Sequence, residues 1–166
     1  MSRVSRREQT SAFSLVEITI ALGVAAFCLL AIVGLLQTGL TSEKATIGQT
    51  TGGGILSLIY SDLSASQANA SLSPAYQFSL SNQTLNTPQT LYLSESGEPT
   101  GSIGSAPTGA SRFRVSVGIQ SPATNSQAPA LARIVVTWPA LADPVPGQWA
   151  AKASGSVEVL TALERR

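Results

Sequence analysis

The chain has no histidine, a single cysteine and few charges, and each shortage excludes a class of function. Only 11% of its 166 residues are charged and the net charge is +1, so no nucleic-acid partner is predicted. The missing histidine removes the commonest general base and a favoured metal ligand. Cys28 has no second cysteine with which to form an intrachain disulfide. With no nucleophile and base set either, we expect a non-enzymatic chain without a cofactor or metal site.

The hydrophobic residues are concentrated in one run near the N-terminus. Residues 18–36 are nineteen in number, and Thr19 carries the only polar side chain among them. Crossing the hydrocarbon core of a membrane takes roughly 20 helical residues. Three basic residues, Arg3, Arg6 and Arg7, precede the run. They predict a cytoplasmic leader, a single membrane span and a translocated C-terminal part.

Two ordinary segments share this pattern. A secretory signal peptide has an apolar core of roughly 7–15 residues followed by a small-residue cleavage site. The run in this chain is longer, and no clean A-x-A site follows it. An uncleaved signal anchor fits the length and the charges equally well, so these two properties leave it open.

Glu17 stands at the leading edge of the apolar run. A charged side chain at the centre of a membrane helix costs about 2.5–3.5 kcal/mol on insertion scales. Near the end of the helix the cost is smaller, because the carboxylate can reach the interface. The acid therefore either marks the membrane boundary or serves a function.

Residues 11–17 read SAFSLVE, and this segment resembles the processing site of type IV prepilins and type II secretion pseudopilins. The resemblance implies cleavage by a prepilin peptidase between Ala12 and Phe13, followed by N-methylation of Phe13. It also implies that Glu17 sets the register of assembly by meeting the Phe13 amine of the next subunit. Ala12 stands where the family usually has glycine. Alanine is still small, so we expect slower or looser processing.

The resemblance covers about the first third of the chain and implies a structural role. The chain would be a minor pilin or pseudopilin subunit of a type IV pilus, a type II secretion system or a DNA-uptake machine. Its partners would be the prepilin peptidase, other pilin or pseudopilin subunits and, before assembly, inner-membrane lipid. It would start as a single-pass inner-membrane protein and end in an envelope filament. The alternative is a signal-anchored envelope protein whose β-rich domain binds a ligand or surface.

The expected fold class is α+β, with a long N-terminal helix packed on a small C-terminal antiparallel sheet, as the resemblance to pilins also implies. We expect a leader over residues 1–12, a transmembrane and assembly helix over 13–40, its continuation over 41–66 and a β-rich domain over 67–166. Each glycine inside a helix costs about 1 kcal/mol relative to alanine. Gly52, Gly53 and Gly54 therefore predict a break, kink or mobile joint, or a flexible linker, whereas the resemblance implies one continuous helix.

Alternating apolar residues predict short strands. They occur over residues 76–80 and 91–93, and then more clearly over 112–119, 133–138 and 156–160, with a loop over 94–109.

Arg112 and Arg114 are expected on a solvated sheet face. Trp138 is expected in the core, while Trp149 could be buried or exposed. Glu95 and Glu98 share the loop but lack the spacing of an EF-hand; the resemblance to pseudopilins, some of which bind calcium in a loop, leaves weak calcium binding by these two acids open.

Overall fold

The computed structural model describes residues 14–67, 70–81, 84–120 and 129–163. The chain divides into two compact units, residues 1–43 and 44–166, and each is described by itself. One helix, α1 (Leu15–Ser64, 50 residues), contributes to both units.

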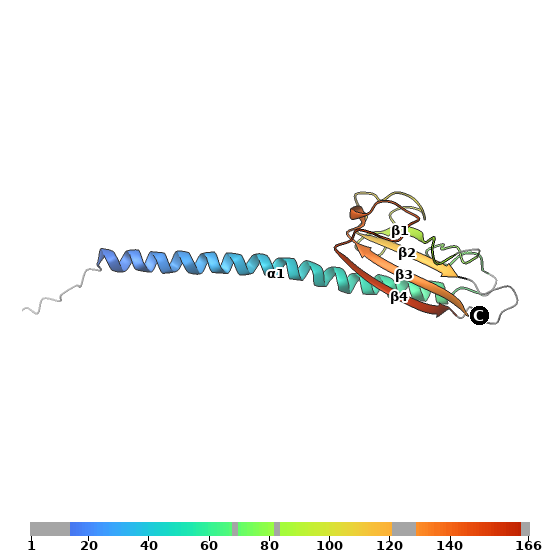
Figure 1. Cartoon of the computed structure of the whole chain (residues 1–166), viewed down its shortest axis with the longest axis horizontal. Coiled ribbons are helices and arrows are strands. Elements are labelled where there is room, and N and C mark those ends of the chain that lie inside the picture. Colours follow the sequence, from blue (N-terminus) through green and yellow to red (C-terminus); the bar gives the residue numbers. More distant parts are fainter. Residues whose placement is uncertain (1–13, 68–69, 82–83, 121–128, 164–166) are drawn as a thin grey trace, which may run out of the picture. The chain divides into compact units, whose positions relative to one another are not determined.

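In the second unit, α1 buries one face against a four-stranded sheet (Figure 1). Ile55, Ile59 and Leu63 are buried and lie four residues apart, so their side chains fall on the same side of the helix. This spacing is what makes the C-terminal part of α1 amphipathic. The first unit has no such stripe, because its apolar residues surround the helix on all sides.

The sheet is antiparallel throughout, and its strands lie in chain order. They are β1 (Gln89–Leu93), β2 (Phe113–Gln120), β3 (Ala130–Trp138) and β4 (Gly155–Leu163), arranged β1-β2-β3-β4. A short 3-10 helix, η1 (Ala140–Ala142), follows β3. A long apolar helix with a four-stranded antiparallel sheet confirms the α+β class, and it confirms the strands expected over 91–93, 112–119, 133–138 and 156–160.

The register places one row of apolar side chains from each strand against α1. Val115 pairs with Val136, which pairs with Val157. The first two are fully buried, while Val157 at the outer strand is only half-buried. The core also takes in side chains from the segment between α1 and β1, namely Phe78 and Leu80.

The break expected near residues 52–54 is wrong, because α1 continues through all three glycines. The indole ring of Trp138 explains two of the helix glycines. A Cβ atom on Gly52 would lie 2.7 Å from Cζ3 of Trp138, and one on Gly48 would lie 2.9 Å from Cε2. Residues four apart share a helix face, so Gly48 and Gly52 together form a flat surface against which this ring packs.

The strand expected over residues 76–80 is also wrong. A single bridge joins Leu72 to Ser79, and Gln77 adopts a left-handed conformation with φ 61°. A residue in that conformation turns the chain instead of extending it. The apolar alternation arises because Phe78 and Leu80 both reach the core from a turn.

Asp62 fixes this turn to the end of α1. Its buried carboxylate accepts hydrogen bonds from the Ser73 hydroxyl (2.5 Å) and from the backbone N–H groups of Ala75 (2.7 Å) and Tyr76 (3.1 Å). A buried carboxylate is stable when such donors surround it. Asp62 therefore connects the helix to the segment that leads into the sheet.

Over β2, the second face of the sheet is covered by a loop, which corrects the expected position of Arg114. This side chain is 1% exposed, and it donates hydrogen bonds to the backbone carbonyls of Asp143 (3.1 Å), Val145 (2.9 Å) and Gln148. The loop between β3 and β4 thus lies over the outer face of β2. Arg112, at the start of the strand, is exposed as expected.

Candidate functional site

The beginning of α1 holds the acid that sequence analysis singled out. The Ser14 carbonyl accepts hydrogen bonds from the N–H groups of Glu17 (3.0 Å) and Ile18 (3.2 Å), which closes the first turn of the helix. Glu17 lies in that turn and is exposed. A carboxylate in a first turn is favoured by the partial positive charge of the helix N-terminus.

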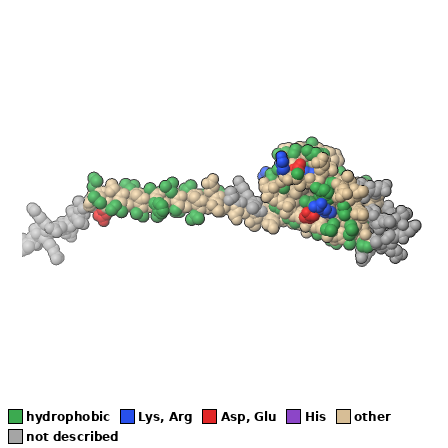
Figure 2. Space-filling view, viewed as in Figure 1, with side chains coloured by type: hydrophobic (Ala, Val, Ile, Leu, Met, Phe, Trp, Pro, Cys, Tyr) green, Lys and Arg blue, Asp and Glu red, His purple; other side chains and the backbone are tan. Residues whose placement is uncertain are grey.

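Of the described helices, α1 alone is long and apolar enough to cross a membrane, over the 26 residues Leu15–Leu40. Every side chain in this segment is exposed in the isolated chain, and Figure 2 shows hydrophobic side chains along the visible face of the first part of α1. Apolar surface of this extent is rarely left in water. Lipid, or the helices of other protein chains, would cover it.

The polar hydroxyls within this segment are satisfied by the helix backbone. Thr19 Oγ1 donates to the Val16 carbonyl at 2.8 Å, and Thr38 Oγ1 donates to the Gly34 carbonyl at 3.4 Å. Internal hydrogen bonds of this kind are what a helix in hydrocarbon requires of its polar groups. The two threonines therefore do not oppose a membrane position.

No described residue forms an ion pair with Glu17. The expected cleavage position, Ala12 and Phe13, lies outside the described residues. The structure thus places Glu17 on the exposed first turn, and leaves its pairing with the Phe13 amine as a prediction.

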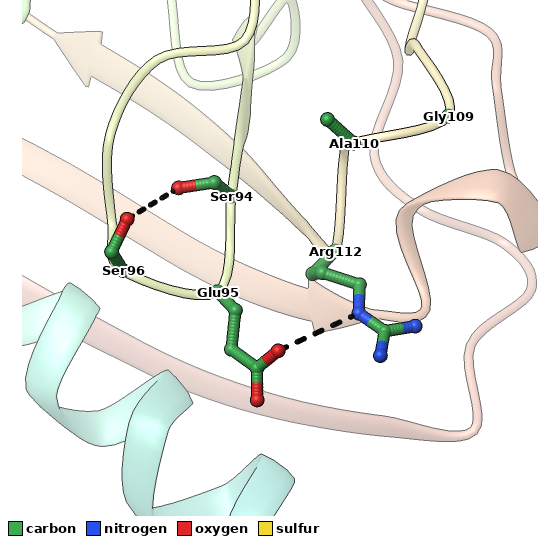
Figure 3. Close-up of a pocket in the computed structure, with 6 residues that line it drawn as sticks. All are labelled: Ser94, Glu95, Ser96, Gly109, Ala110 and Arg112. Carbon is green, nitrogen blue, oxygen red and sulfur yellow. Dashed lines mark hydrogen bonds and ion pairs between the residues drawn. The ribbon is translucent and has the colours of Figure 1, made fainter.

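Figure 3 shows a shallow, open depression on the sheet domain, where the loop after β1 meets the segment before β2. Its charged residues are Glu95 and Arg112, which lie 4.0 Å apart with side chains 72% and 65% exposed. Ser94 and Ser96 hydrogen-bond to each other at 2.8 Å. Solvent screens a pair this exposed, and the residues lining the depression include no nucleophile and base pair. The depression has neither the enclosure nor the convergent groups of a small-molecule site.

The three arginines of the sheet domain do not combine into a strip of unpaired positive charge. Each guanidinium lies beside a carboxylate, in the pairs Arg112–Glu95, Arg114–Asp143 and Arg133–Glu158. Within the described residues, no three acidic or cysteine side chains are gathered as they would be around a metal ion. This part of the domain therefore offers no concentrated charge of either sign to a ligand.

Trp149 has a structural contact on each side. Its indole N–H donates to the Leu85 carbonyl at 3.0 Å, and the guanidinium of Arg133 lies 4.1 Å from the ring centroid. A cation over an aromatic face is attracted by the ring. The side chain is half-buried, so it serves to hold the β3–β4 loop against the sheet.

Sequence reasoning missed the buried pair of Arg114 and Asp143, whose Nη1 and Oδ2 atoms lie 3.0 Å apart. Burial alone would raise the pKa of Asp143. The N–H of Ala151, the charge of Arg114 and the N–H groups of Lys152 and Val145 together hold that pKa below its ordinary value of 3.8. The alternation in β2 could place Arg114 on the outer face, but it carried no signal that a loop covers this face.

The chain was compared with protein-family models, with curated proteins and with solved structures, and no match was found in any of the three.

Proposed function

We propose that this chain is a minor pilin-like or pseudopilin-like subunit, processed by a prepilin peptidase and assembled into an envelope filament through α1. One observation carries the proposal. Glu17 is the acid in the first turn of a 26-residue apolar segment, Leu15–Leu40, whose side chains are all exposed. Its position relative to Phe13 is that of the acid in the prepilin processing site.

The carboxylate of Glu17 would favour association of the apolar helices. Two apolar helices gain little from meeting in lipid, because lipid tails are as apolar as leucine. Cleavage after Ala12 would create a free amine on Phe13. An amine and a carboxylate are each costly away from water, and pairing offsets part of that cost. Contact between Glu17 of one subunit and Phe13 of the next would set the axial register.

The distribution of charge supports the orientation. Arg3, Arg6 and Arg7 precede the apolar segment, and basic residues remain on the cytoplasmic side. The leader would stay in the cytoplasm, and the sheet domain would be carried across the inner membrane. Removal of the leader would then take its arginines away from the helix that enters the filament.

Mass spectrometry of the protein extracted from membranes tests the proposal. We expect a mature chain that begins at Phe13 and carries one added methyl group. An Ala12→Gly variant should be processed at least as completely, and an Ala12→Arg variant should keep its leader. A chain that retains residues 1–12 when the peptidase is present would support a signal-anchored envelope protein and contradict this proposal.

A further inference from the structure

The two edges of the sheet differ in whether their backbone is covered. At the β1 edge, the N–H of Thr100 donates to the Tyr92 carbonyl (2.9 Å), and the N–H of Gly104 donates to the Thr90 carbonyl (2.8 Å). A bridge also joins Leu93 to Pro99. The loop after β1 therefore closes that edge to other chains.

Among the described residues, none covers the β4 edge in this way. β4 pairs with β3 along all nine residues, and no described residue outside β3 makes a backbone hydrogen bond to β4. In an antiparallel pair, alternate residues direct their N–H and C=O groups away from the partner strand. A row of backbone groups with no hydrogen-bond partner in the described part of the chain therefore runs along the outer side of β4.

The sequence of β4 has only one of the usual devices that block an open edge, a single charged side chain. Natural edge strands carry lysine, proline or a bulge, or are very short. β4 reads GSVEVLTAL, so it contains no proline and no basic residue. Its pairing with β3 advances one residue at a time, without a bulge. Its single charged side chain is Glu158.

Apolar side chains flank the open edge on both faces of the sheet. On the side of α1, the core rows end in Val157 and Val159, which are half-buried although their neighbours on β3 are fully buried. On the other face, Leu160 is 63% exposed and Leu131 is 42% exposed. A strand placed beside β4 would extend both faces and cover the three of these side chains that lie on β4, namely Val157, Val159 and Leu160.

We infer that β4 receives an extended segment of another polypeptide by strand addition. The segment would be apolar at alternate positions, and it would carry lysine or arginine next to Glu158. Main-chain hydrogen bonds supply affinity in this mode of recognition, and alternate side chains supply specificity. The inference goes beyond the proposed function, because it concerns the folded sheet and does not depend on processing or on α1 assembly.

Charge argues against a second copy of β4 as the occupant. β4 carries one acid and no base, so a second copy would bring another carboxylate and no cation to Glu158. By contrast, the natural neighbour β3 offers Arg133, which donates to Glu158 at 2.7 Å and 3.2 Å. The Glu158 side chain remains about half exposed even with this pairing, so a further cation can approach it from the open edge.

A peptide with the sequence of β3, ALARIVVTW, is a suitable probe because this sequence already pairs with β4. Fluorescence anisotropy of the labelled peptide would be measured against the full chain in detergent micelles, with empty micelles as the blank. We expect saturable binding. Two further peptides would be N-methylated, each at a different set of alternate amides. Their affinities for the protein should differ, because only one of the two sets of N–H groups faces β4 in the bound peptide. Absence of binding, or equal binding of all three peptides, would overturn the inference.

Two proline variants of the protein locate the site. Val159 and Leu160 are consecutive, so one directs its N–H toward β3 and the other toward the open edge. Proline is tolerated where the N–H faces outward. Of Val159→Pro and Leu160→Pro, we expect one to keep the circular dichroism spectrum and melting temperature of the parent protein and to lose affinity for the peptide by about tenfold or more.

Leu141→Ala, at an exposed residue of η1, is the control and should leave peptide binding unchanged. If neither proline variant folds, the N-methylated peptides make the same test from the other side of the contact. Sedimentation of the full chain alone tests whether the occupant is a second copy of the chain. Self-association that the folded proline variant abolishes, together with no binding of the peptide, would make the occupant a second copy and overturn the inference.

Discussion

The indole ring of Trp138 lies directly against the backbone of Gly48, in the space that any larger side chain would need. Gly52, one turn further along α1, and Gly155, at the start of β4, also contact the ring closely. The edge of Phe113 meets the ring with a centroid distance of 6.0 Å. Trp138 is thus held between helix and sheet by residues that leave room for it.

Replacement of Gly48 or Gly52 by alanine should destabilise the domain. In Gly48→Ala or Gly52→Ala, the new methyl group would overlap Trp138, which is confined by Phe113 and Gly155. Overpacking of a filled core costs about 1–3 kcal/mol, which exceeds the roughly 1 kcal/mol that alanine gains over glycine in a helix. Urea denaturation of the full chain in micelles, followed by circular dichroism, would measure the loss.

Gly54 supplies the matched control for this series. A Cβ atom there would meet no atom within 4 Å, so Gly54→Ala should raise the free energy of unfolding by about 0.5–1 kcal/mol. An equal change in the free energy of unfolding for Gly48→Ala and Gly54→Ala would contradict the close packing of Trp138 against Gly48.

Removal of the negative charge from Asp143 should destabilise the domain more than any exposed charge substitution. Asp143→Asn would leave the buried guanidinium of Arg114 without its carboxylate. Loss of one partner from a buried pair costs about 3–5 kcal/mol, and we expect the lower end because Asp143 is 17% exposed. Glu95→Gln, at the exposed pair with Arg112, should change the free energy of unfolding little. Equal effects in the two variants would contradict the role given to burial.

The same carboxylate predicts how stability depends on pH. The pKa of Asp143 is lower in the folded chain than its ordinary value of 3.8. The unfolded chain therefore takes up the proton first as pH falls. The stabilisation is fully present above about pH 4, and it is lost as pH decreases from there through the lower folded pKa. Denaturation midpoints measured between pH 6 and pH 2 should fall more steeply for the parent protein than for Asp143→Asn. Parallel curves would show that another group controls the acid response.

Glu17 should be required for assembly and dispensable for the fold. Glu17→Ala leaves the sheet domain untouched, but it removes the carboxylate proposed to meet the Phe13 amine. We expect the variant to be inserted and processed, with incorporation into filaments reduced at least tenfold in sheared-filament fractions; such a loss corresponds to about 1.4 kcal/mol. Glu43→Ala is the control, since Glu43 is an exposed acid on the same helix beyond the apolar segment. Undiminished incorporation of Glu17→Ala would argue against the pairing.

The parts of the fold that could be predicted depend on regular patterns within single segments. The alternation in Val115, Val117 and Ile119 predicts β2, because every second side chain on that strand faces α1. The apolar run predicts the first part of α1 because its length alone is informative. Pairing of Glu17 with Phe13 stays a prediction, since it requires a second molecule.

The parts that could not be predicted depend on contacts between distant segments. Gly48 and Gly52 suggest a weak helix when taken alone, and only the ring of Trp138, far along the chain, makes them favourable. Arg114 has the local pattern of a solvated residue, but carbonyls from the β3–β4 loop surround it. Neither relationship leaves a signal in the spacing of nearby residues.

The order β1-β2-β3-β4 means that each strand after β1 hydrogen-bonds to the strand that precedes it in the chain. A polypeptide exported from its N-terminus onward would therefore always find the docking site for its next strand already outside the membrane. No strand has to wait for a later one, and none has to be inserted between two that have already joined. In the orientation proposed for this chain, the sheet would grow one strand at a time as the domain emerges, with β4 added last.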